Sequence, residues 1–169
     1  MDNKIVVRQL SANLISIISY FIFLFISLLI QYKSHSYLVL EINPFIILSP
    51  LILSVLHELL HYIGYRYLAK IPKNEIFLSK AKILTLPFVT TSTQMSKEEY
   101  IKVLVLPTII LAFTLMFFII TSPNLLNSIV FTTGVSIGTG DILMVKSLVA
   151  NKEASYIKPT ENQFGVYVI

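Results

Sequence analysis

The sequence contains four apolar segments, each long enough to cross a membrane as a helix, and these limit the folds that the chain can adopt. A crossing helix needs about 20 residues. The segments run over about 10–31, 44–68, 101–120 and 125–149. Lipid offers no partners to backbone N–H and C=O groups, so such segments are expected to be helical. The sequence therefore predicts an all-α integral membrane protein with a single membrane domain over residues 1–169.

The composition supports this class. Hydrophobic residues make up 55% of the 169 residues and charged residues 13%, and the mean hydropathy is +0.77. Ordinary soluble domains carry about 25% charged residues, so a soluble globular domain, a disordered chain and a coiled coil are excluded. The chain has no cysteine, which excludes a disulfide framework and a thiolate metal site. The net charge of +4 comes mostly from lysines that flank apolar runs, which indicates a lipid surface as partner and no nucleic acid.

The loops predict the orientation. Cations gather in the N-terminus, in the loop 70–100 and in the C-terminal tail, whereas the turn 121–124 has no charge and the segment 33–43 carries Lys33 as its one fixed cation. By the positive-inside rule we expect both termini and the loop 70–100 on the cytoplasmic side. The first apolar segment follows two cations, as in a signal peptide. It is too long for one and lacks a small-residue cleavage site, so we expect a retained span.

The loop 70–100 is the one sizeable segment between predicted spans. Residues 75–78 and 82–93 are rich in aliphatic residues, phenylalanine and threonine, which predicts a short β-hairpin at the membrane face. Ser96 and Glu99 have the spacing of a capping box, in which each side chain binds the backbone N–H of the other residue. This pair is expected to begin the third helix.

The motif HExxH lies in the middle of the second span, as His57-Glu58-Leu59-Leu60-His61. In a helix the two histidines lie one turn apart on the same face, so both imidazoles can bind one zinc ion. Glu58 is offset by about 100° and can reach water at the open position of the metal. There it would act as general base and return the proton to a leaving amine.

The membrane setting strengthens this interpretation. A charged side chain inside a bilayer costs several kcal/mol, so an intramembrane acid such as Glu58 indicates function by default. The alternative is that His57 and His61 form hydrogen bonds between helices and that Glu58 lines a polar seam.

A zinc hydrolase needs a third protein ligand. The remaining histidine, His35, is expected in the outer loop, on the order of 20 Å away along the second helix. Asp141 is the only acid inside the fourth span. The midpoint of the motif is nine residues from the cytoplasmic end of its span and Asp141 is eight from that of its own. The two predicted depths therefore differ by about 1–2 Å, and we expect Asp141 to be the third ligand.

Glycines surround Asp141 in the fourth span. Gly134, Gly138 and Gly140 would let helices approach closely and allow a local break that directs the carboxylate inward. The alternative is a packing face of small residues four apart at Gly134 and Gly138, and the two interpretations are compatible. Lys146 is a competing partner for Asp141, but it is close enough to the interface to extend its ammonium group into water.

Other residues near the motif give weaker signals. Pro107 would kink the third span beside the site, although prolines are common in membrane helices. The tyrosines that follow the motif, Tyr62, Tyr65 and Tyr67, are expected to be interface anchors.

The HExxH motif in one span, followed by Gly140-Asp141 in a later one, resembles the Putative zincin peptidase family of bacteria, which are small multi-span membrane proteins. The resemblance also includes the stretch from Met95 to Pro107. In placing HExxH in one span and an aspartate in a later one, these proteins are similar to the site-2 proteases, which are intramembrane metalloproteases. Site-2 proteases typically place their third ligand in an Asn-Pro-Asp-Gly setting, whereas this chain has Gly-Thr-Gly-Asp.

The resemblance implies a zinc peptidase in the bacterial cytoplasmic membrane, a multi-pass protein whose substrate is a membrane protein or peptide. It implies a catalytic base and three zinc ligands at matching positions: Glu58 as the base, and His57, His61 and Asp141 as the ligands.

The sequence thus predicts an intramembrane zinc metalloprotease that hydrolyses a membrane-embedded or membrane-proximal substrate near the cytoplasmic face. A substrate helix must unwind first, and we expect the segment 75–93 to offer a strand edge that holds it extended. One alternative is a non-catalytic metal-binding membrane protein with a regulatory or immunity role. Another is a metal transporter, which needs several polar residues along a path, whereas the acids and histidines here converge at one depth.

Overall fold

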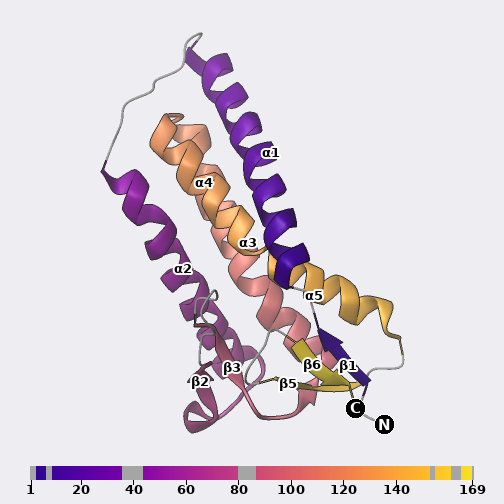
Figure 1. Cartoon of the computed structure of the whole chain (residues 1–169). Helices are drawn as coiled ribbons and strands as arrows, with labels where there is room; N and C mark the ends of the chain where they lie inside the picture. Colours follow the sequence, from indigo (N-terminus) through magenta and orange to yellow (C-terminus); the bar gives the residue numbers. More distant parts are fainter. Residues whose placement is uncertain are drawn as a thin grey trace.

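The computed structural model is a bundle of helices with a small β layer at one end (Figure 1). The residues that it describes are 3–6, 9–35, 44–79, 87–152, 155–160 and 165–168. Among them are four helical stretches long and apolar enough to cross a membrane: Asn13–Ser34, Phe45–Leu68, Lys97–Thr121 and Leu125–Ala150. The prediction of four membrane-length apolar helices is confirmed.

The helices follow one another up and down the bundle. Their bounds are α1 Gln9–His35, α2 Phe45–Ile63, the π-helical turn η1 Gly64–Leu68, the 3₁₀ turn η2 Lys73–Glu75, α3 Lys97–Thr121, α4 Leu125–Ile137 and α5 Thr139–Ala150. His35 was predicted to lie in the outer loop, and this was wrong, because it is the last residue of α1. The predicted capping box is confirmed, since the Ser96 hydroxyl accepts from the Glu99 N–H at 3.2 Å and the Glu99 carboxylate accepts from the Ser96 N–H at 3.0 Å.

The fourth membrane-length stretch is two helices that meet at Gly138, and α5 turns away from the axis of α4 (Figure 1). The predicted break at the glycines is therefore present. A Cβ atom at Gly138 would lie 2.3 Å from the Thr108 Oγ1 and 3.1 Å from its Cβ. The absence of a side chain at Gly138 thus lets the α4–α5 junction contact α3.

The predicted hairpin is present in part: β2 Ile76–Leu78 pairs antiparallel with β3 Val89–Thr91, and residues 80–86 of the predicted hairpin lie outside the described residues. The prediction of an otherwise all-α chain was wrong. A four-stranded sheet of order β1-β6-β5-β4 joins both ends of the chain to the start of α3. Its strands are β1 Asn3–Val6, β4 Met95–Ser96, β5 Tyr156–Pro159 and β6 Gly165–Val168. Segments this short show almost no period-two pattern, and their partners are far apart in sequence.

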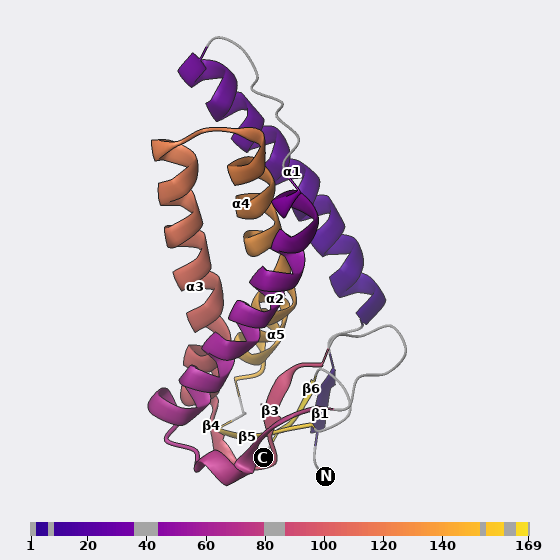
Figure 2. The same ribbon diagram turned by 90° about the vertical axis from the view of Figure 1, so that its left-hand side faces the viewer.

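The β layer closes the end of the bundle at which α2 ends and α3 begins (Figure 2). Ile157 and Val166 of the sheet are fully buried in one cluster with side chains of α3 and α5. The other members of that cluster are Tyr65, Ala69, Ile71, Met95, Tyr100, Val103, Leu104, Met144 and Leu148. That this end faces the cytoplasm stays a prediction.

The contact at Gly138 can be tested by Gly138→Ala. Gly138 has a φ of −72°, which any residue adopts, so the cost comes from the contact with Thr108. We expect a loss of about 1–3 kcal/mol in the free energy of unfolding, as for other overpacked cores. Reversible unfolding in detergent, followed by circular dichroism, measures it. In the Thr108→Ala background the same change should cost less than half as much, and equal costs in both backgrounds would contradict the contact.

Candidate metal centre

The two histidines of the motif lie on the buried face of α2. Its buried residues, Ser49, Leu53, His57 and His61, are spaced four apart, so they form one stripe along the helix. The imidazoles of His57 and His61 meet edge to face, with their Nε2 atoms 3.1 Å apart. The helical spacing of the motif therefore brings two ring nitrogens to one point, as predicted.

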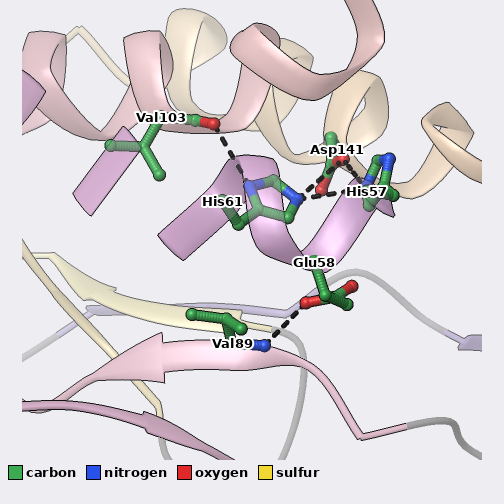
Figure 3. Close-up of polar contacts among 6 residues, drawn as sticks. All are labelled: His57, Glu58, His61, Val89, Val103 and Asp141. Carbon is green, nitrogen blue, oxygen red and sulfur yellow. Dashed lines mark hydrogen bonds and ion pairs between the residues drawn. The ribbon is translucent and has the colours of Figure 1, made fainter. Parts of the chain in front are cut away.

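Asp141 lies in the first turn of α5, just after the break at Gly138, and its carboxylate faces both rings (Figure 3). Its Oδ2 is 2.9 Å from the Nε2 of His57 and 3.2 Å from the Nε2 of His61. The exposed fractions of His57, His61 and Asp141 are 3%, 6% and 5%. The structure thus brings together the side chains that the depth comparison placed at one level. Lys146, the competing partner, is exposed.

The three converging atoms fit a metal ion. Two atoms bound to one tetrahedral zinc at about 2.0–2.1 Å lie about 3.3 Å apart. The observed edges of the triangle are 2.9, 3.1 and 3.2 Å. Although both rings are so near, Asp141 Oδ2 receives no hydrogen bond of acceptable direction. This is expected where the nitrogen and oxygen lone pairs are directed at a shared point.

A backbone carbonyl orients His61. Its Nδ1 lies 3.2 Å from the carbonyl oxygen of Val103 in α3. A carbonyl only accepts, so Nδ1 carries a proton, and Nε2 is the ring nitrogen that faces the centre. Gly64 permits this contact, because a Cβ there would lie 3.3 Å from the Val103 Cα. The Nδ1 of His57 is buried and has no hydrogen-bond partner among the described residues.

Glu58 points away from the triangle, toward the β-hairpin (Figure 3). Its Oε2 accepts a hydrogen bond of 2.7 Å from the backbone N–H of Val89 in β3. Ligand atoms of His57, Glu58 and His61 nevertheless all lie within 4.8 Å of one another. The carboxylate is therefore near enough for one water molecule to connect it with the centre.

The hairpin presents one edge of β3 to α2. The Ser79 N–H donates to the Phe88 carbonyl, and Phe77 lies opposite Thr90. In an antiparallel pair, bonded and non-bonded positions alternate. The N–H and C=O groups of Val89 and Thr91 consequently point away from β2. Val89 uses its outward N–H to bind Glu58.

Sequence reasoning missed the backbone partners of the site. The Val103 carbonyl and the Val89 N–H leave no mark in a sequence pattern, because every residue has these groups. Tyr65 was wrongly predicted to be an interface anchor. It is buried against Tyr100 of α3, with ring centroids 6.4 Å apart, whereas Tyr67 is exposed.

Comparison with known proteins adds one finding. The family model described as "Putative zincin peptidase" matches residues 50–156, from α2 to the start of β5, which is more than half of the chain. No curated protein and no solved structure matches this chain. The similarity to site-2 proteases stays a prediction. The matched range includes the HExxH motif and Asp141, and the chain belongs to the Putative zincin peptidase family.

Proposed function

We propose that this chain is a membrane-bound zinc metallopeptidase that cleaves membrane-embedded or membrane-proximal substrates near the cytoplasmic face. The observation that carries the proposal is the triangle of buried atoms from His57, His61 and Asp141, with a glutamate of the same helical turn beside it. Membership of a zincin family supports peptidase chemistry at this site. Four apolar helices of membrane length support the location.

In this proposal His57, His61 and Asp141 hold the zinc ion. When bound, zinc lowers the pKa of water and polarises a peptide carbonyl. Glu58 accepts the proton of the attacking water and returns it to the leaving amine. To do so, its carboxylate must release the N–H of Val89, which it binds in the structure.

The outward edge of β3 is the proposed place for the substrate backbone. A substrate helix must unwind before cleavage, because its carbonyls are bound internally. An extended segment that reaches this edge would meet the N–H of Val89, whose residue is partly exposed. The N–H of Val89 can bind either Glu58 or such a segment, so arrival of substrate would free the base.

The zinc ligands can be tested by metal analysis of detergent-purified protein. We expect about one zinc per chain in the wild type and its loss in His57→Ala and in Asp141→Ala, because three ligands define the site. Glu98→Ala, which removes an exposed acid in the first turn of α3, is the matched control and should keep the metal. Zinc retained in Asp141→Ala would assign the third ligand elsewhere. Absence of zinc from the wild type would support the alternative in which His57 and His61 only form hydrogen bonds between helices.

The role of Glu58 can be tested by Glu58→Gln. The amide oxygen can still accept from Val89 and the zinc ligands are untouched, so fold and metal content should persist. We expect cleavage to fall by about 10²–10⁴-fold, the usual contribution of a general base. Zinc-loaded protein is incubated with solubilised membrane proteins, and new peptide N-termini are counted by mass spectrometry. Equal counts for Glu58→Gln and wild type would support the alternative of a non-catalytic metal protein.

The hairpin can be tested by replacing residues 76–91 with a short Gly-Ser linker in the Glu58→Gln background. If the edge of β3 holds the substrate, this variant should recover far fewer membrane peptides on pull-down than Glu58→Gln alone. Zinc content is the control for folding, since none of the three proposed ligands is in the hairpin. Undiminished recovery with normal zinc content would remove the hairpin from substrate binding.

A further inference from the structure

Pro107 lies inside α3, four residues after Val103. In an α-helix the carbonyl of residue i accepts from the N–H of residue i+4. Proline has no N–H, so the Val103 carbonyl lacks its usual partner within α3. The helix nevertheless continues from Lys97 to Thr121.

The carbonyl that Pro107 leaves free is the one that binds His61. Its oxygen lies 3.2 Å from the His61 Nδ1, and Val103 is fully buried. Gly64, three residues after His61, brings α2 close enough to α3 for the contact. The His61 Nδ1–H of α2 therefore takes the place of the N–H that α3 lacks at Pro107.

We propose that Pro107 is a positioning residue for the metal centre. Because proline has no N–H, the Val103 carbonyl stays available to His61. The hydrogen bond from the His61 Nδ1 to this carbonyl holds the ring with its Nε2 toward His57 and Asp141. The inference rests on the proposed zinc site. Hydrogen bonds of this kind to metal-binding histidines set the tautomer and the ring orientation, and their loss typically costs about 10- to 100-fold in metal affinity.

The second proline within a helix of the described chain is Pro50 in α2, and it provides a matched control. Its ring leaves the Ile46 carbonyl without a donor in the same way. There the hydroxyl of Ser49, a residue of the same turn, donates to that carbonyl at 3.1 Å. The Ile46 carbonyl thus has a donor within α2, and replacement of Pro50 should leave His61 undisturbed.

The experiment compares Pro107→Ala, Pro107→Val and Pro50→Ala with the wild type. Both changes at Pro107 restore an N–H that competes for the Val103 carbonyl. One side chain is smaller than proline and the other larger, so a cavity cannot explain an effect common to both. Folding is expected to survive, because each replacement adds a helical hydrogen bond. Zinc affinity is measured by competition with a chromophoric chelator.

The second readout needs no metal. Ring ¹⁵N shifts of labelled histidine in the metal-free protein report the tautomer, with His61→Ala to assign the signal. We expect a proton on Nδ1 of His61 in the wild type and in Pro50→Ala. In both Pro107 variants we expect a shift toward the other tautomer and an affinity for zinc about 10- to 100-fold lower.

Unchanged affinity and tautomer in Pro107→Val would overturn the inference, and so would an effect confined to Pro107→Ala, which would indicate packing. If the wild type binds no zinc, the proposed function fails, and the tautomer comparison still decides whether Pro107 orients the His61 ring. A change of tautomer in both Pro107 variants supports it, and the same tautomer throughout rejects it.

Discussion

The central constraint on the proposed site is a carboxylate buried among apolar helices. Asp141 is 5% exposed, and the groups nearest its Oδ2 are two imidazole nitrogens. A buried charge costs several kcal/mol unless a cation or well-directed donors compensate it. Oδ2 has no hydrogen-bond partner among the described residues. A metal ion at the common point would supply the compensation, which is why this contact carries the proposed function.

Irregularities of the backbone surround this contact. The helix break at Gly138 places Asp141 in a first turn directed at α2. Gly64 allows α2 to approach α3 at Val103, whose carbonyl lacks its usual hydrogen bond within α3 because Pro107 has no N–H. Each irregularity would be a defect in a regular bundle, yet each lies beside the same three side chains. Functional sites are where such departures from local regularity are expected.

The β layer joins the site to the rest of the chain. The edge of β3 binds Glu58 through the N–H of Val89, and the four-stranded sheet is packed on α3 and α5, which carry Val103 and Asp141. The sheet is built from both ends of the sequence. It therefore closes the end of the bundle at which α2 ends and α3 begins (Figure 2).

The four apolar helices, the capping box at Ser96 and the pairing of two histidines one turn apart could be predicted from the sequence, because they depend on local composition and helical spacing. The sequence also singled out Asp141, since an isolated acid inside a span is costly. The four-stranded sheet, the burial of Tyr65 and the backbone partners of His61 and Glu58 became visible in the folded chain alone. Backbone groups are the same in every residue, so their partners depend on which segments pack together and leave no pattern in the sequence.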